Sequence, residues 1–154
     1  MEFHILKATE TDYPDILECI KELALFEKAP EKVSNNLEQM TKEKDYFQSY
    51  IVRDNQGNTL GFALYFFAYY TWVGKSLYLD DIYIKEEFRN LGIGKALLKK
   101  IFEVAKTENC SRVRFQVLDW NLNAIEFYKK TGATLDNEWI NCDYDKDFVS
   151  KGME

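Results

Sequence analysis

The sequence of 154 residues is poor in the residue types that build covalent or metal-based chemistry. It has one histidine, His4, and three cysteines, Cys19, Cys110 and Cys142, which are odd in number and form no CxxC pair. A disulfide framework and a zinc site are therefore not expected, and we expect the cysteines to be small buried hydrophobic residues. Because His4 lies in a predicted first strand and is expected to be structural, the chain also lacks a Ser/His/Asp or Cys/His constellation for nucleophilic catalysis.

Long apolar runs and an excess of basic residues are absent as well. No run approaches the length of a membrane span, and the first residues, MEFHILKATE, lack the basic and long apolar regions of a signal peptide. There are 20 Lys and Arg residues against 26 Asp and Glu, a net charge of −6, which disfavours nucleic acid and is compatible with a small cationic substrate. We expect a cytoplasmic protein that binds neither nucleic acid nor membrane. One core is expected, hence a single domain over residues 1–154.

The middle of the chain is predicted to be a strand, a tight glycine turn and a helix. Leu77 and Leu79 share one strand parity, whereas Ile82 and Ile84 share the other. One extra residue in a strand produces such a change of face, so the pattern predicts a β-bulge at Asp80-Asp81.

The run Arg89-Asn90-Leu91-Gly92-Ile93-Gly94 follows this strand. Two glycines let backbone N–H groups converge, and they directly precede a helix with an apolar face formed by Leu97, Leu98, Ile101 and Ala105. Turn amides and the positive end of the helix dipole then point to one place, which predicts an anion site. A dinucleotide fingerprint would need a third glycine where Leu97 stands, and a P-loop would need Gly-Lys-Ser/Thr after a longer spacer.

The remaining elements follow from periodicity and turn residues. We expect a strand at Phe3–Leu6, a helix from Thr11-Asp12 to near Glu27–Pro30, a polar helix from Ser34 capped by Ser34 or Asn35, hairpin strands at Tyr50–Val52 and Leu60–Tyr70, a strand at Val113–Val117, a helix at Asn121–Lys130 capped by Gly132, and strands through Ala133 and around Trp139–Tyr144. This order predicts an α/β protein with a mixed sheet and helices on both faces.

The run Arg-x-x-Gly-x-Gly, behind a bulged strand and opening a helix, resembles the pyrophosphate loop of the GNAT superfamily of acetyl-CoA-dependent N-acetyltransferases. The order of elements resembles the GNAT fold, a central mixed, mostly antiparallel, twisted sheet that splays at the bulge. Within the superfamily the chain is most similar to the diamine (spermidine/spermine) and thialysine N-acetyltransferases. The stretches that carry this resemblance are IKELALFE, GFALYFFAYYTWVGKSLYLDDIYI, RNLGIGK and LDWN with FYKKTGA.

The resemblance implies acetyl-CoA as cosubstrate, with no metal. When the family's positions are matched to this sequence, the pantetheine arm would pair with the backbone of the bulged strand and the pyrophosphate would rest on the glycine turn. The start of the predicted helix at Asn121–Lys130 would line the coenzyme. The implied coenzyme-binding residues are Ile82, Tyr83, Ile84, Arg89, Asn90, Leu91, Gly92, Ile93, Gly94, Lys95, Asn121, Leu122, Asn123 and Ala124. A solvated Arg89 and an ordinary helix cap at Asn121 are the alternative interpretations.

The same resemblance gives Tyr128 as the candidate general acid. Attack on a thioester expels a thiolate, and a phenol with a pKa of about 10 stays protonated at neutral pH. Asp80, at the bulge, is the candidate group that holds the amine and relays its proton, since an alkylamine with a pKa of about 10.4 must lose a proton before it attacks. A core tyrosine and a solvated strand carboxylate are the alternatives.

Acceptor contacts carried over from the family fall on Phe26, Glu27, Asp80, Arg114, Phe115, Gln116 and Glu138. The polyamine enzymes typically carry Glu-Asp where this chain has Asp80-Asp81, and the neighbouring pieces look more like the thialysine branch. The family also implies a homodimer. Two other functions stay open at this point, a protein or peptide N-acetyltransferase and a non-catalytic acyl-CoA-binding module.

Overall fold

The computed structural model describes residues 1–153 and divides them into two compact units. The first unit runs from Met1 to Gln116 and the second begins at Val117. The first contains the whole sheet, and each unit is described by itself.

The first unit is built on a five-stranded sheet in the order β1-β2-β3-β4-β5. The first four strands pair antiparallel, and β5 joins β4 in parallel. The predicted mixed, mostly antiparallel sheet is therefore confirmed. The strands span Phe3–Lys7 (β1), Gln48–Asp54 (β2), Thr59–Tyr70 (β3), Gly74–Ile84 (β4) and Val113–Arg114 (β5).

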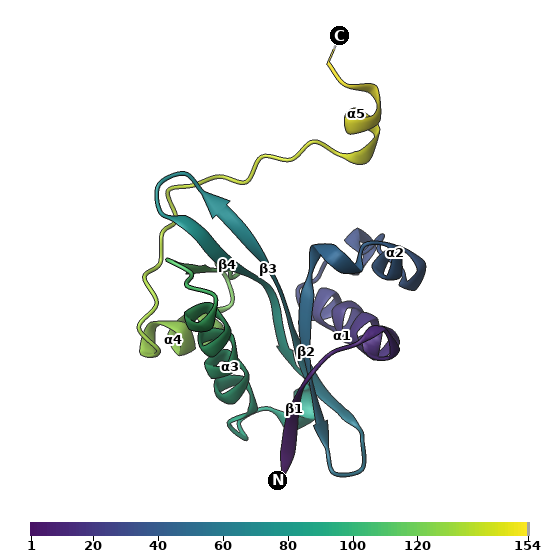
Figure 1. The fold of residues 1–154 in the computed structure, drawn as a ribbon, viewed down its shortest axis with the longest axis vertical. Helices are drawn as coiled ribbons and strands as arrows, with labels where there is room; N and C mark the ends of the chain where they lie inside the picture. The colour runs from purple at the N-terminus through teal and green to yellow at the C-terminus, as the bar shows by residue number, and fades with distance from the viewer. Residues whose placement is uncertain (154) are drawn as a thin grey trace. The chain divides into compact units, whose positions relative to one another are not determined.

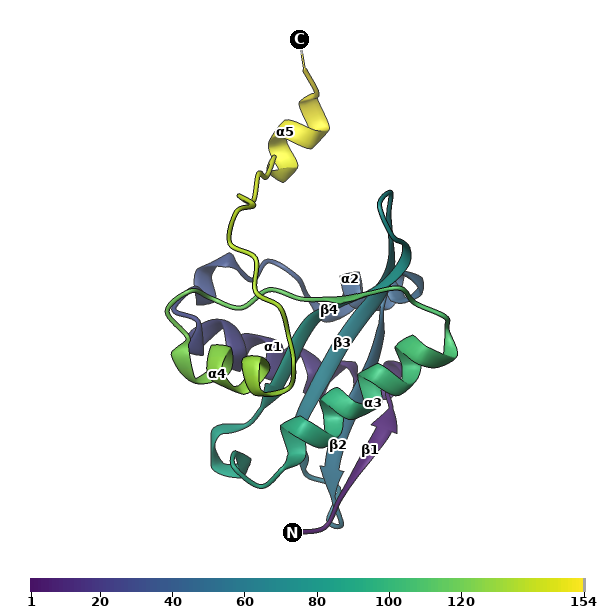
Figure 2. The ribbon, with the colours of Figure 1, turned by 90° about the vertical axis from the view of Figure 1, so that its left-hand side faces the viewer.

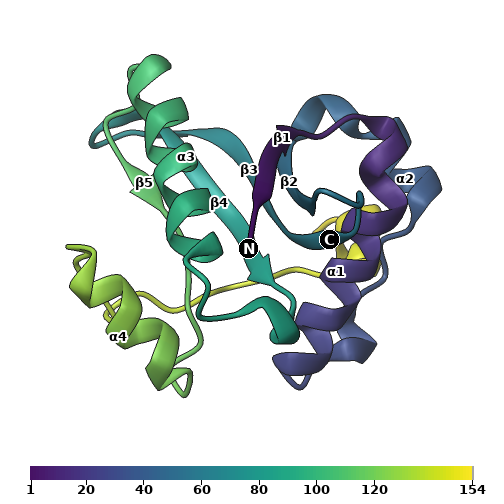
Figure 3. The ribbon, with the colours of Figure 1, turned by 90° about the horizontal axis from the view of Figure 1, so that it is seen from below.

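Helices cover both faces of this sheet, with α1 and α2 on one side and α3 on the other (Figures 1 and 3). Burial on both faces explains why the middle of β3 is continuously apolar, since the neighbours Phe62 and Ala63 are both fully buried. The α-helices of this unit are α1 (Tyr13–Phe26), α2 (Leu37–Lys42) and α3 (Ile93–Thr107), and the 3-10 turns are Glu10–Asp12, Pro30–Lys32, Lys44–Tyr46 and Glu86–Phe88. The cap of α2 is Asn36, one residue beyond the predicted candidates.

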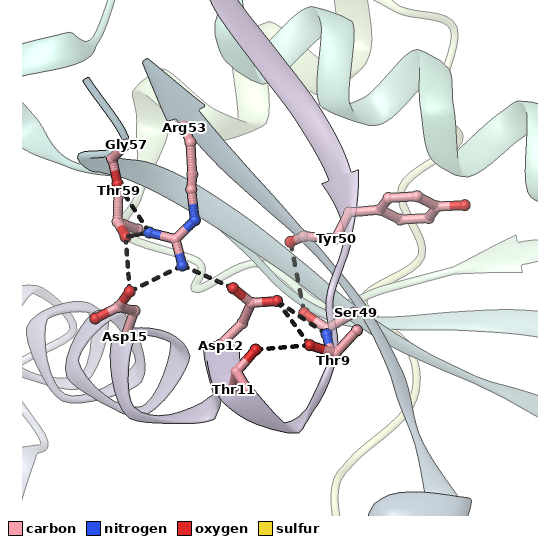
Figure 4. A network of polar contacts seen from close by, with 9 residues as sticks. All are labelled: Thr9, Thr11, Asp12, Asp15, Ser49, Tyr50, Arg53, Gly57 and Thr59. Atoms are coloured by element: carbon pink, nitrogen blue, oxygen red, sulfur yellow. Dashed lines mark hydrogen bonds and ion pairs between the residues drawn. The ribbon is translucent and has the colours of Figure 1, made fainter. Parts of the chain in front are cut away.

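A polar network ties the start of α1 to the sheet (Figure 4). The Arg53 guanidinium of β2 donates to Asp12 at 2.7 Å and to Asp15 at 2.9 Å, and it also donates to the Thr59 hydroxyl of β3. Burial opposes ionisation of Asp12, but hydrogen bonds from Thr9 and Arg53 outweigh it and lower the pKa of Asp12. With its first turn anchored, α1 brings its other end to the bulge of β4.

The bulge lies where the sequence places it. Asp81 pairs with Leu64 and Leu79 pairs with Tyr65, so Asp80 is the extra residue without a partner on β3. On its other edge β4 pairs with β5 only at Leu77 and Tyr78, so this pairing ends before the bulge, whereas the pairing with β3 continues to Ile84. In residues 1–153, no further strand pairs with that edge of β4, so the predicted splay is confirmed.

The second unit contains two helices, α4 (Leu122–Lys130) and α5 (Lys146–Lys151). The predicted strands through Ala133 and around Trp139–Tyr144 are wrong, since the structure has no strand there, and the strand predicted for Val113–Val117 is reduced to Val113–Arg114. A strand needs a partner for its backbone hydrogen bonds, which an alternating sequence does not supply.

The three cysteines differ in burial. Cys19 is buried, as predicted, whereas Cys110 is half-buried and Cys142 is exposed, which corrects the prediction for Cys142. Cys142 is exposed because it lies in the extended segment between the two helices of the second unit, where no strand forms. The part of the chain that the structure describes contains no helix with the length and apolar character needed to cross a membrane.

Candidate active site

The glycine turn and the start of α3 form a cradle of backbone amides. Asn90 and Gly92 both adopt left-handed conformations, with φ of 64° and 81°, and Gly92 caps α3. The first bond of the helix runs from the Ala96 N–H to the Gly92 carbonyl, so the amides before Ala96 have no partner within the helix. A 15-residue helix therefore directs its positive end and its orphan N–H groups out of this turn.

The space in front of the turn is open. A Cβ added to Gly92 would meet nothing within 4 Å, and one added to Gly94 would meet only the Ile84 Cγ1 at 3.8 Å. Leu91 is exposed, whereas Ile93 is buried and anchors the turn to the core. An anionic diphosphate fits this cradle, so the residues fit the coenzyme that the family uses.

The open edge of β4 lies next to this turn. The Lys85 N–H bonds to the Leu60 carbonyl of β3, so the backbone groups of Ile84 and Ile82 point away from β3, while those of Tyr83 point toward it. Of the groups at the open edge, the Ile84 carbonyl accepts a hydrogen bond from Arg89 Nε at 3.0 Å. Strand backbone without a strand partner suits an extended amide-containing chain such as pantetheine.

Arg89 lies against the end of α1. Its guanidinium carbon is 5.1 Å from the centre of the Phe26 ring and 5.6 Å from that of Tyr83. The side chain thus contacts a predicted acceptor residue, Phe26, as well as the strand that is predicted to bind the coenzyme, although the sequence analysis assigns Arg89 only to the coenzyme.

Three carboxylates gather where α1 ends beside the bulge. Burial and then the charge of Asp80 raise the pKa of Glu27. Burial raises the pKa of Asp80, which stays open to solvent although surrounding protein atoms partly desolvate its carboxylate. Burial, followed by the charges of Asp80 and Glu27, raises the pKa of Asp81 to about 7.

None of these three carboxylates forms an ion pair with a lysine or arginine in residues 1–153. Like charges that are partly removed from water and lack a counter-charge favour a cationic ligand. Over the same residues, His, Cys, Asp and Glu side chains form no group of three that could hold a metal ion. The arrangement can bind an ammonium group directly.

Tyr78 connects this cluster to β5. Its ring stacks on Phe66 with centroids 5.1 Å apart, and its phenol pKa is raised by burial and then by Asp80, whereas Arg114 lowers it. Arg114 is exposed on β5, and its guanidinium lies 5.0 Å from the centre of the Tyr70 ring. The structure thus brings Arg114 into the electrostatic environment that Asp80 shares.

The remaining predicted residues are spread over the end of the first unit and the second unit. Phe115 and Gln116 follow β5 at the end of the first unit. Asn121 caps α4 and accepts a hydrogen bond from the Ala124 N–H at 3.3 Å, which confirms its capping role. Next to it, Leu122 and Asn123 are exposed on the first turn of that helix, and Glu138 lies in the extended segment after it.

Tyr128 lies on α4, two turns after Asn121. Its ring packs edge-on against Phe127, with centroids 5.3 Å apart, and burial raises the pKa of its phenol to about 12. Such a phenol is protonated at any physiological pH, which is the state that a proton donor needs.

Sequence reasoning missed one member of this site, Tyr78. The signal for it was available, because Tyr78 lies two residues before Asp80 on the same strand, so the two side chains share one face. The sequence leaves Asp81 open as either an amine-holding carboxylate beside Asp80 or a plain bulge residue, because its raised pKa depends on Glu27 of another element.

The fold and this site define a class of protein that the sequence comparisons confirm. The pattern of the acetyltransferase (GNAT) family matches residues 11–133. The chain belongs to this family and is a GNAT N-acetyltransferase.

Its curated relatives narrow the class. The chain is 39% identical over 140 residues to the thialysine N-epsilon-acetyltransferase of Sus scrofa, covering 84% of this chain and 82% of that protein. It is 34% identical over 141 residues to the human spermidine/spermine N(1)-acetyltransferase-like protein 1, covering 85% of this chain but only 20% of that longer protein. Among solved structures, an integron cassette protein from V. cholerae has a TM-score of 0.76 at 21% identity, covers 98% of this chain and 97% of its own, and shows the same fold.

Proposed function

We propose that this protein transfers an acetyl group from acetyl-CoA to a primary amine of a small cationic acceptor. One juxtaposition carries the proposal. A cradle of orphan amides suited to a diphosphate follows directly after a strand whose bulge bears carboxylates without a counter-charge. An anion site for the coenzyme and a cation site for the acceptor are thus built from one stretch of chain.

The coenzyme would lie along the strand edge and the turn. Backbone amides of Asn90 to Lys95 would bind the diphosphate, and the open edge from Ile82 to Ile84 would pair with the pantetheine arm. The left-handed conformation of Gly92 supports this, because it turns successive amides toward one point. The contacts carried over to Asn121, Leu122, Asn123 and Ala124 remain predictions.

The acceptor would be held by the carboxylates and attack directly. When bound, acetyl-CoA supplies a thioester whose acetyl group can pass to an amine and whose thiolate can leave. Glu27 and Asp80 would hold the ammonium group, and Asp80 would pass its proton to water. Tyr128, kept protonated by its raised pKa, would donate a proton to the departing sulfur. No Ser/His/Asp or Cys/His constellation occurs in the sequence, which favours transfer without a covalent acyl-enzyme.

We propose a thialysine-like or lysine-like amine as the acceptor, in preference to a long polyamine. The relatives named for thialysine and for spermidine/spermine support small amines of both kinds. The carboxylate of Asp80 is shorter than that of the glutamate typical of the polyamine enzymes that resemble this chain, and it would shift the ammonium site accordingly. Contacts from Phe26, Arg114, Phe115, Gln116 and Glu138 to this acceptor also remain predictions.

An acceptor panel tests this function. Thiol release from acetyl-CoA would be measured with thialysine, lysine, putrescine, spermidine, spermine and a lysine-containing peptide. We expect the highest kcat/KM with thialysine or lysine. Preference for the peptide would make the protein a peptide acetyltransferase, and coenzyme binding without thiol release for any amine would make it a non-catalytic acyl-CoA-binding module.

We also propose that the protein acts as a homodimer in the cytoplasm. The hairpin of β3 and β4 projects beyond the ends of β1 and β2 (Figure 2), and Tyr69 and Trp72 at this hairpin are 80% and 82% exposed. Large exposed aromatic side chains that lie together are typical of an interface. Light scattering after gel filtration would give the mass, and a mass near the 18.2 kDa of one chain at micromolar concentration would contradict the dimer.

A further inference from the structure

We propose that Arg112 and Arg114, grouped at the ring of Tyr70, form a carboxylate site that binds the α-carboxylate of an amino-acid acceptor and selects it over a polyamine. This inference rests on the proposed function and deepens it, because it names the part of the acceptor that is recognised besides the amine. Arg114 is already a predicted acceptor contact, whereas Arg112 is a new member of the site.

The two guanidinium groups meet at one aromatic ring. Arg112 directly precedes β5 and Arg114 lies on it, and their guanidinium carbons are 5.2 Å and 5.0 Å from the centre of the Tyr70 ring. Tyr70 is half-buried at the end of β3, so the ring is a fixed support for both groups. A ring face holds a guanidinium through its charge and leaves its N–H donors available for an anion.

Neither of these positive charges has a counter-charge in the protein. In residues 1–153 no carboxylate forms an ion pair with Arg112 or Arg114, although acidic residues outnumber basic ones. Arg53, by contrast, is paired with two aspartates. The planar fork of a guanidinium matches a carboxylate, which it can bind through two parallel hydrogen bonds. The pair is therefore suited to a carboxylate that a ligand brings.

Tyr78 links this pair to the carboxylates that are proposed to hold the amine. Arg114 pairs with Tyr78 in the sheet, so the two side chains are neighbours on one face. Burial raises the pKa of the Tyr78 phenol most, Asp80 raises it further, and Arg114 lowers it. The phenol thus lies within the electrostatic range of both a carboxylate and a guanidinium. Along this face, the sheet offers negative charge at the bulge and positive charge at β5.

This order of charges matches an acceptor with an ammonium group at one end and a carboxylate at the other. Lysine and thialysine have this form. A polyamine would instead bring a further ammonium group toward the two arginines, which would repel it. The same arginines would therefore attract one class of acceptor and disfavour the other.

The diphosphate is not expected to reach this pair. Arg114 is opposite Tyr78, before the bulge, whereas the glycine cradle follows the other end of β4. Loss of either arginine should therefore leave the affinity for coenzyme A unchanged. This affinity also serves as a check that the variants are folded.

The test compares lysine with cadaverine, which is lysine without its carboxylate. In wild type we expect kcat/KM for lysine to exceed that for cadaverine at least about tenfold, the range of a charge-assisted hydrogen bond. Arg112→Ala and Arg114→Ala should each lower kcat/KM for lysine about tenfold to a hundredfold, chiefly through KM, and leave cadaverine unchanged or improved. Arg112→Lys, which keeps the charge but loses the fork, should fall in between.

Lys75→Ala is the matched control. Lys75 also lies over an aromatic ring of the same hairpin, that of Phe67, but these two residues belong to the other face of the sheet. The substitution removes the same charge and should preserve the ratio between lysine and cadaverine. A ratio that falls as far in Lys75→Ala as in Arg112→Ala would show that only net charge matters and would overturn the proposal.

A binding measurement separates this proposal from the proposed function. Lysine and cadaverine would be titrated calorimetrically into protein saturated with coenzyme A, where no acetyl group can be transferred. We expect tighter binding of lysine, and loss of this difference in Arg112→Ala. Equal binding of both amines by wild type, equal losses for both in Arg112→Ala, or weaker coenzyme A binding in that variant would overturn the carboxylate site. Failure of wild type to acetylate any amine would instead refute the proposed function, and the titrations would still decide whether the site exists.

Discussion

The carboxylates of Glu27 and Asp80 lie close enough that the charge of Asp80 raises the pKa of Glu27, although one ends α1 and the other forms the bulge of β4. Asp81 lies within reach of both. A site with three such carboxylates gains most from a ligand that brings positive charge.

Neutralising the carboxylates proposed to hold the acceptor should weaken acceptor binding and leave coenzyme binding unchanged. We expect Asp80→Asn or Glu27→Gln to lower kcat/KM for the amine about tenfold to a hundredfold, because a charge-assisted contact of about 1.5–3 kcal/mol is lost. Coenzyme A affinity, measured by calorimetry, should not change. Glu43→Gln makes the same change in net charge at an exposed position and should leave kcat/KM unaltered. Equal losses in all three variants would show that only net charge matters.

The raised pKa of Asp81 predicts a pH-dependent stability. Its pKa is about 7 in the folded protein and about 3.9 in the unfolded chain, so between these values only the folded state holds the proton. The contribution of Asp81 to the free energy of unfolding therefore falls as pH rises from about 4 to about 7, and stays constant above. Asp81→Asn should be more stable than wild type by about 1–3 kcal/mol at pH 8, and the difference should shrink toward pH 4. Urea unfolding at pH 5 and pH 8 measures this, and an equal difference at both would contradict it.

Removal of one hydroxyl tests the proton donor. Tyr128→Phe should lower kcat about a hundredfold to ten-thousandfold, the range of general acid catalysis, and leave coenzyme affinity unchanged. Because the phenol pKa is about 12, the wild-type rate should show no loss up to pH 9 from ionisation of this group. Tyr46→Phe, at an exposed tyrosine, is the control. Unchanged kcat at saturating substrates would remove Tyr128 from the mechanism.

One glycine of the cradle, Gly94, and one outside it, Gly57, should separate coenzyme binding from stability. A Cβ at Gly94 meets only an ordinary contact, so Gly94→Ala should fold as well as wild type, yet bind coenzyme A at least about tenfold more weakly because the methyl enters the cradle. Gly57, with φ of 86° in the β2–β3 turn, is the converse control, since Gly57→Ala should lose about 1 kcal/mol of stability and keep its coenzyme affinity. Thermal unfolding and calorimetry measure both. Coenzyme binding by Gly94→Ala at wild-type strength would place the diphosphate elsewhere.

Local patterns were sufficient wherever one segment determines its own structure. The change of apolar parity around Asp80 predicted the bulge, and two glycines before an amphipathic run predicted the turn and helix, since both depend on backbone conformations that the residues themselves favour. Predictions of strands that depend on a neighbouring strand for their hydrogen bonds were less accurate. The alternation around Trp139–Tyr144 resembles a strand, but in residues 1–153 no strand forms there.

The sequence by itself determined the bulged strand, the glycine turn and the helix that follows it, together with the family to which they belong, because adjacent residues impose these features through sterics and periodicity. Only the tertiary structure decided which side chains share the site. It placed Glu27 beside Asp80, and it stacked Arg89 on Phe26. Such pairs come from elements far apart in the chain, and they meet only when α1 packs across the sheet and is anchored at both its ends.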